Sequence, residues 1–393
     1  MPKKKGNRGK KPTRGKNEQR EHTQKSKCSV GSDELSTFSN LSIFQDDLLE
    51  QILVYLPLAS IIRARLVCKK WREITSSKRF LWNASQTVQQ KPWYFMYVDN
   101  FLSPTSPTWY AYDPILQNCH GGDFLDMMKS HTSFDSSDGL VCFVKDNEIH
   151  VCNPITKEHK KLHDPPRTCL YHHRRLINIW VNRRLQNYNV SVLDYEDAHV
   201  NVEISFQVYD SATMKWATSQ PEILIGWTID CKSVICNGVL YFLIYSTGGG
   251  PIKDGLLAYN FSSNSSTDGT LINSIIPLPC SMIFGLMNLK EKLIIVGAID
   301  KPGGENLHTG FGIWLLKGKN WLEISRITRP CFYISYGNFD SSGADDLIYI
   351  HNKEDPELVV FDMNQKQWTC CQDCPLEYVT TGFCFQPRLD ISP

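Results

Sequence analysis

Apolar and polar positions follow two different patterns along the chain, and the pattern changes near residue 90. Between residues 41 and 82, apolar positions recur every three to four residues, which is typical of amphipathic helices. From Lys91 onwards, short runs rich in Val, Ile, Tyr, Phe and Trp alternate with clusters of Gly, Asp, Asn and Pro, which is typical of short antiparallel strands. Long helical patterns do not separate these runs, which argues against a βαβ architecture. The sequence therefore predicts a small all-α unit followed by an all-β domain.

Three short helices are expected in the first unit. Asp46 or Asp47 can cap the first helix, and Pro57 ends it. Ser60 can cap the second helix, and the third is expected over residues 66–74. A unit this small buries only a modest share of its surface, and its first helix is apolar over more than one stripe. One apolar face is therefore expected to lack a partner within the chain.

A repeat runs through the second unit: in five copies an aromatic residue or Cys precedes Asp or Asn, and in three copies a Trp follows an aromatic residue at a step of seven residues. The anchors lie 40 to 57 residues apart, near the period of kelch-type propellers. We expect each anchor to end the third strand of a four-stranded blade, with Asp or Asn turning the chain and Trp packing from the fourth strand against a neighbouring blade. Copies with a Trp seven residues on begin at Tyr209, Trp314 and Phe361, and weaker copies begin at Tyr112, Cys152 and Tyr259.

Six anchors predict a six-bladed, kelch-type β-propeller over residues 91–387. The ring must close, because an open ring would leave unpaired strand edges on its first and last blades. Val379–Gln386 is the spare strand. It is expected to become the innermost strand of the blade that contains Trp93–Val98 and Tyr110–Asp113.

The helical unit, residues 41–84, resembles the F-box. A Leu-Pro pair is followed in the expected order by Val-Cys-x-x-Trp, although Phe44-Gln45 stands where the family usually opens with Leu-Pro. The resemblance implies docking onto the Skp-type adaptor of an SCF-type cullin–RING ubiquitin ligase; the alternative is a helical cap on the C-terminal domain. The residues implied to bind the adaptor are Phe44, Leu48, Leu49, Ile52, Leu53, Leu56, Pro57, Val67, Cys68 and Trp71.

Both units together resemble plant-type F-box/kelch-repeat proteins, with Ser137–Cys142 and Val151–Pro154 as the most recognisable part outside the F-box. The double glycines of ordinary kelch blades are mostly absent from the expected strand. The resemblance implies a non-catalytic substrate receptor, whose propeller holds a protein target for ubiquitination and proteasomal degradation. Two alternatives stay open: a receptor for a small molecule or glycan, and a propeller oxidase, which would need a cluster of Tyr and His around a metal.

Long connections between strands are expected on one face of the propeller. In a four-stranded blade, the second-to-third and fourth-to-next-first connections lie on the same face, and the longest connections all belong to these two kinds. Such loops have the length, polarity and aromatic content of a recognition surface. The candidate target-binding residues there are Arg174, Arg175, Tyr195, Lys253 and His308.

Charge is concentrated at the start of the chain. Residues 1–27 carry eleven Lys and Arg against Glu18 and Glu21, a net charge of +9, which leaves −8 for the rest. With few apolar residues, residues 1–40 are expected to be a disordered tail and linker. Lys3-Lys4-Lys5 and Lys10-Lys11 suit either a nuclear-import signal or a solvated leader, so nucleus, cytoplasm or both are expected. Nucleic-acid binding is not expected, because aromatic residues do not interleave these charges.

Other candidate chemistry is weak. The fourteen cysteines show no disulfide framework, which suits a reducing compartment. Cys371-x-x-Cys374 lacks a second pair at zinc spacing and is interpreted as loop cysteines. No apolar run is long enough to span a membrane, and no apolar segment follows the basic leader as in a secretory signal. We expect no cofactor, no metal and no catalytic residues.

Overall fold

The computed structural model divides into two compact parts, residues 1–49 and residues 50–393. The structure describes the first part only from residue 46, so the basic leader and Phe44 lie outside the described residues, as do Lys253 and Cys374. The structure describes residues 46–87, 90–97, 109–121, 133–166, 173–196, 201–248, 254–261, 269–300, 308–328, 339–353, 357–371 and 381–393.

Four helical segments occupy residues 46–87, one more than expected. The first covers residues 46–53, followed by α2 (Leu58–Ala64), α3 (Lys69–Ser76) and α4 (Lys78–Thr87). The prediction missed α4 because its polar end resembled a spacer.

Two predicted helix starts were also wrong. Pro57, rather than Ser60, precedes α2, because proline lacks an N–H and its fixed φ suits a helix start. Cys68 caps α3, with its Sγ accepting a hydrogen bond from the Trp71 N–H at 3.5 Å. The third helix therefore begins after Val67 rather than at Leu66.

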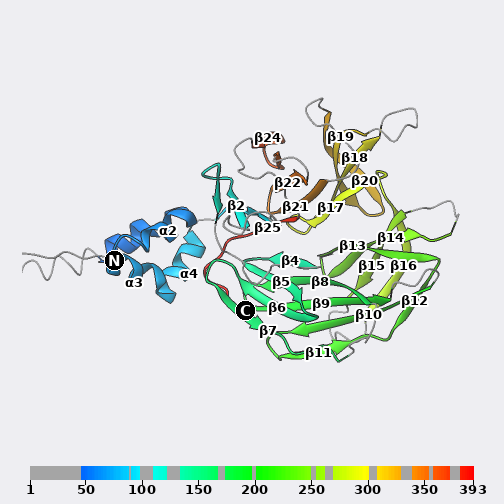
Figure 1. The fold of residues 1–393 in the computed structure, drawn as a ribbon, viewed down its shortest axis with the longest axis horizontal. Helices are drawn as coiled ribbons and strands as arrows, with labels where there is room; N and C mark the ends of the chain where they lie inside the picture. Colours follow the sequence, from blue (N-terminus) through cyan, green and yellow to red (C-terminus); the bar gives the residue numbers. More distant parts are fainter. Residues whose placement is uncertain are drawn as a thin grey trace, which may run out of the picture. The chain divides into compact units, whose positions relative to one another are not determined.

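In the described residues, the strands form six antiparallel sheets, which are the six blades of a β-propeller (Figure 1). The order within each sheet runs from the innermost to the outermost strand. Blade 1 contains β25 (Thr381–Phe385), β1 (Trp93–Tyr97), β2 (Trp109–Asp113) and β3 (Asn118–Gly121); blade 2 contains β4 (Phe134–Ser137), β5 (Leu140–Lys145), β6 (Glu148–Asn153) and β7 (Glu158–Lys161).

Blade 3 has a divided outer edge. Its third strand, β10, pairs with β11 along one half and with the additional strand β12 along the other half. The sequence did not predict β12. Blade 3 contains β8 (His173–Asn182), β9 (Asn187–Glu196), β10 (Asn201–Asp210), β11 (Lys215–Thr218) and β12 (Glu222–Ile225).

Blades 4 to 6 repeat the simple four-stranded order. Blade 4 contains β13 (Trp227–Cys236), β14 (Val239–Ser246), β15 (Asp254–Asn260) and β16 (Thr270–Pro277). Blade 5 contains β17 (Ile283–Asn288), β18 (Leu293–Asp300), β19 (His308–Lys317) and β20 (Asn320–Thr328). Blade 6 contains β21 (Phe339–Ala344), β22 (Leu347–Asn352), β23 (Leu358–Asp362) and β24 (Gln367–Cys371).

The ring closes as predicted. The C-terminal strand β25 pairs antiparallel with β1, with Trp93 opposite Phe385 and Tyr97 opposite Thr381 (Figure 1). Strand β25 also contacts both neighbouring blades, because the Ser136 hydroxyl donates to the Cys384 carbonyl and the Cys384 N–H donates to the Ser342 hydroxyl. The last strand of the chain therefore completes the first blade.

Five of the six repeat anchors act as predicted. The sixth, Trp314, does not end its strand, because β19 continues to Lys317. The other five place Asp or Asn as the last residue of a third strand, and in four the side-chain Oδ1 accepts a backbone N–H two residues on, forming an Asx turn. The three repeat tryptophans donate from Nε1 to the preceding blade: Trp216 to the His163 carbonyl, Trp321 to the Pro277 carbonyl and Trp368 to the Ser325 hydroxyl. The turns are thus fixed locally, and the tryptophans link neighbouring blades.

Gly139 and Asn153, which belong to the most recognisable sequence motifs outside the F-box, contact the segment that follows β25. Gly139 has a φ of +92°, and a Cβ there would lie 2.6 Å from Cβ of Arg388. The Asn153 Nδ2 donates to the carbonyls of Arg388 (3.0 Å) and Ile391 (2.9 Å). Ile391 is buried in the core between blades 2 and 3. The chain end is therefore packed onto blade 2.

Candidate functional sites: an apolar helical surface and a propeller face

The helical unit leaves large apolar side chains in solvent. Ile52, Tyr55, Leu66 and Val67 are each at least 63% exposed. We call these four residues the exposed apolar set. Leu48, one turn before Ile52 in the same helical segment, is also exposed. Exposed apolar side chains at this density in so short a unit indicate a protein-binding surface.

A network of polar contacts keeps this unit rigid. Glu50 is buried and forms an ion pair with Arg79. Thr75 is buried on α3, and its hydroxyl donates to the Trp71 carbonyl at 2.7 Å. Arg65 donates to the Thr75 carbonyl at 3.2 Å, and burial lowers the pKa of its guanidinium. These contacts therefore link the helices that flank the exposed apolar set, of which only Ile52 lies in a helix.

The predicted adaptor residues divide by burial. Leu53 is only 1% exposed and belongs to the core, because it lies one position from Ile52 and points away from the exposed side of the helix. Tyr55 and Leu66, which lie outside the F-box pattern, are exposed. Of the others, Leu48, Ile52, Val67 and Cys68 are exposed, and Leu49, Leu56, Pro57 and Trp71 are partly buried.

Several predicted target-binding residues lie on strands rather than in loops. Tyr195 is on β9 and is 1% exposed, packed in the core between blades 3 and 4, because the strand extends past it and alternation turns its ring inward. Arg174 and Arg175 are on β8, which begins at His173. His308 opens β19, where its backbone pairs with Asp300. Tyr195 is therefore a core residue.

The Arg175 side chain is bound by a carboxylate of the propeller itself. Its Nε donates to Oδ1 of Asp194 at 2.7 Å and its Nη2 to Oδ2 at 3.4 Å. Asp194 is buried and also accepts from Nε2 of Gln207 at 3.0 Å. Removal of either partner would leave an uncompensated buried charge. Arg175 is therefore better explained as a structural residue than as a target contact.

The innermost strands carry charged and polar groups towards the propeller axis. Lys232 of β13 lies 3.5 Å from Asp340 of β21, which links blades 4 and 6. Burial alone would lower the pKa of Lys232, but the Asp340 carboxylate raises it overall. Nearby, the Tyr94 hydroxyl bonds to Nδ1 of His351, and burial lowers the pKa of His351 to about 4. These contacts connect blades that are distant in sequence.

A cavity of about 640 Å³ opens among the ends of the inner strands, and Trp180 and Phe261 line it with stacked rings 5.7 Å apart. Asp135 is the most perturbed acid there: burial raises its pKa to about 6, although the Ile179 N–H and the Asn178 amide both donate to it. The Asn178 Oδ1 accepts from the Ser233 hydroxyl at 2.8 Å. These groups connect blades 2, 3 and 4.

Asp135 and His351 predict opposite pH effects on stability. The folded state binds a proton on Asp135 more readily than the unfolded chain does, so this group adds stability as the pH falls from about 6 towards 3.8. His351 binds a proton less readily when folded, so its contribution is lost as the pH falls from 6.5 towards about 4. In wild type the two effects partly offset each other.

We therefore expect Asp135→Asn to make the free energy of unfolding fall more steeply between pH 6.5 and pH 4.5. Two pKa units correspond to about 3 kcal/mol, which is an upper bound on the difference from wild type. Urea denaturation followed by tryptophan fluorescence measures this quantity. The matched variant His351→Gln should change the slope in the opposite direction, and an unchanged slope in Asp135→Asn would contradict the burial argument.

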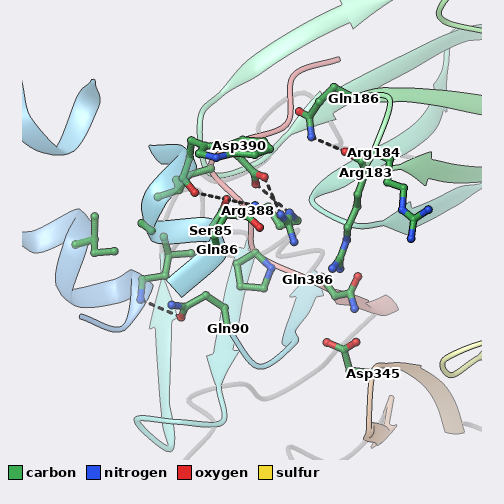
Figure 2. A pocket seen from close by; sticks show the side chains of 16 residues that line it. Ser85, Gln86, Gln90, Arg183, Arg184, Gln186, Asp345, Gln386, Arg388 and Asp390 are labelled. Carbon is green, nitrogen blue, oxygen red and sulfur yellow. Dashed lines mark hydrogen bonds and ion pairs between the residues drawn. The ribbon is translucent and has the colours of Figure 1, made fainter. Parts of the chain in front are cut away.

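A second cavity, of about 480 Å³, lies beside the segment that follows β25 (Figure 2). Most of its polar side chains already have partners within the protein. Arg388 forms a bidentate pair with Asp390 at 2.9 and 2.7 Å, and Gln90 accepts the Leu58 N–H at 3.1 Å. The cavity therefore has few polar groups left to recognise a ligand.

Among the described residues, no group of three or more His, Cys, Asp or Glu side chains is placed to hold a metal ion. None of the described helices is long and apolar enough to cross a membrane.

The fold and the helical surface define a class of protein: an F-box-like unit joined to a β-propeller. Residues 46–84 match the F-box-like family, and residues 119–292 match the F-box associated beta propeller domain. The chain is 44% identical to an F-box/kelch-repeat protein of Arabidopsis thaliana over 91% of this chain and 92% of the relative. It is 25% identical to F-box only protein 6 of the same plant, over 95% of this chain and 80% of that protein. The chain belongs to the F-box/kelch-repeat proteins.

Proposed function

We propose that the protein is the substrate-recognition subunit of an SCF ubiquitin ligase. Its F-box binds a Skp-type adaptor and, through it, the cullin and RING subunits, while the propeller binds a protein target for ubiquitination and degradation. The observation that supports this proposal best is the exposed apolar set on an F-box-like unit. A surface of this kind is costly in water and becomes favourable when an apolar partner covers it.

In this proposal the protein acts by proximity and contributes no reacting group. A target held by the propeller has a raised effective concentration near the ubiquitin-loaded conjugating enzyme that the cullin and RING subunits recruit. A closed propeller suits this role, because six blades linked by β25 hold a target in a fixed position.

We place the target on the face with the second-to-third connections. The linker enters β1 at Trp93, which pairs with the last residue of β25. Strand β1 therefore begins at the face with the first-to-second turns, opposite the long connections. This arrangement leaves the long connections away from the point where the chain arrives from the helices.

Reconstitution tests the proposal. The purified full chain and a variant lacking residues 41–84 are each mixed with a Skp-type adaptor and analysed by size-exclusion chromatography. The full chain should co-elute with the adaptor and, once cullin, RING and conjugating enzyme are added, should support ubiquitin transfer to itself. The variant should do neither. A full chain that elutes apart from the adaptor at micromolar concentration would rule out the SCF assignment.

A further inference from the structure

Strand β12 is an outer edge of the propeller with an unusual composition. It pairs with β10 through Glu222–Ile204 at one end and Ile225–Asn201 at the other, and in the described part of the chain no strand pairs with its second edge. Alternate residues of such a strand direct their N–H and C=O groups away from the sheet. A free edge of this kind is a ready template for another extended chain.

The side chains of β12 favour contact with another chain and do not prevent strand pairing. Leu224 is buried in the core between blades 3 and 4 and fixes the strand. Its neighbours Ile223 and Ile225 point the other way and are 63% and 74% exposed. Natural edge strands usually carry charges that discourage pairing, as β7 does with exposed Glu158 and Lys161. The exposed side of β12 carries two isoleucines instead.

Acidic side chains lie on both faces of this edge. Glu203 lies directly opposite Ile223 on β10 and is exposed. Glu222 begins β12, and its carboxylate accepts the Leu271 N–H. No Lys or Arg occurs in β12 or in residues 201–210 of β10. The surroundings of this edge therefore favour a partner with positive charge.

The position of β12 connects this edge with the face proposed for the target. Strand β12 pairs with the first half of β10, next to the β9–β10 connection, which is of the second-to-third kind. It then passes through Gly226, at a φ of +76°, into β13, as a fourth-to-next-first connection does. Both connections belong to the long-connection face.

We propose that β12 binds an extended segment of the target protein by strand addition, and that this segment carries apolar residues at alternate positions together with Lys or Arg. The inference rests on the proposed receptor function. Backbone hydrogen bonds to the free edge supply affinity, Ile223 and Ile225 cover the alternate apolar residues, and Glu203 attracts the positive charge.

The test uses a phage-displayed library of random linear peptides, selected on the purified full chain without adaptor. Selected peptides should show alternating apolar residues with Lys or Arg, and the double variant Ile223→Glu/Ile225→Glu should weaken their binding by at least about tenfold. The matched control Leu185→Glu/Leu322→Glu changes two exposed apolar residues away from β12 and should bind normally. Glu203→Gln should weaken the basic peptides by a smaller factor and reduce their salt dependence.

N-methylation of the peptide separates strand addition from simple apolar contact. Methyl groups on one alternate set of amides should abolish binding, and methyl groups on the other set should not, because only one set faces β12. Equal binding to wild type and the β12 double variant would overturn the proposal, as would selection of no β12-dependent peptide. Light scattering tests whether the β12 edge binds a second copy of this chain instead. If wild type self-associates and the double variant does not, a second copy occupies the edge and the proposal is overturned. Because no adaptor is present, these results are independent of the SCF test.

Discussion

A chain that ends at Asp373 is expected to lose the whole propeller fold rather than a single strand. The truncation removes β25 and the segment after it, which place Phe383, Phe385, Leu389 and Ile391 in buried positions. It also exposes β1 as an unpaired inner edge and opens the ring between blades 6 and 1. Every blade is supported by two neighbours only in a closed ring.

A comparison of free energies supports complete unfolding. Loss of one large buried apolar side chain costs about 2–5 kcal/mol, so four of them cost about 8–20 kcal/mol, which is as large as the total stability of about 5–15 kcal/mol that natural domains have. Circular dichroism and a thermal melt report the result. A chain that ends at Ile391, which lacks only Ser392 and Pro393, is the control and should melt like the full chain. A native melting curve for the Asp373 truncation would show that closure by β25 is dispensable.

Much of the propeller could be predicted because its repeat has a local physical cause. In four blades, Asp or Asn at the end of the third strand forms an Asx turn within three residues, so the signal is visible in sequence. The partners of the tryptophans could not be predicted, since Trp368 donates to Ser325 from another blade. Strand β12 was missed for a related reason: its pairing partner on β10 follows only from the folded blade.

For the candidate sites too, local patterns could be predicted from the sequence and packing could not. The F-box pattern located the helical unit, but burial within it depends on packing, and Leu53 proved to be core while Tyr55 and Leu66 proved to be exposed. In the propeller, Tyr195 looked like a loop aromatic because the residues after it are polar. The strand continues to Glu196, and alternation places the Tyr195 ring inside. Strand length, which sequence fixes poorly, decided between surface and core.

The last prediction concerns the adaptor. The double variant Ile52→Asp/Val67→Asp should weaken binding of a Skp-type adaptor at least about a hundredfold, because two charges replace apolar side chains at the centre of the proposed contact. A hundredfold loss corresponds to about 2.7 kcal/mol. Both side chains are 63% exposed in the free protein, so the variant should keep the stability of wild type. Isothermal titration calorimetry measures the affinity.

Two further variants separate contact from fold. Leu185→Asp introduces a charge at an exposed apolar residue between β8 and β9 and should leave adaptor affinity unchanged. Leu53→Ala should behave differently from both: because Leu53 is buried, it should destabilise the helical unit by about 2–5 kcal/mol and lower adaptor affinity only through the fraction unfolded. Wild-type affinity in Ile52→Asp/Val67→Asp would remove the exposed apolar set from the interface. The alternative of a helical cap on the propeller would then account better for these helices.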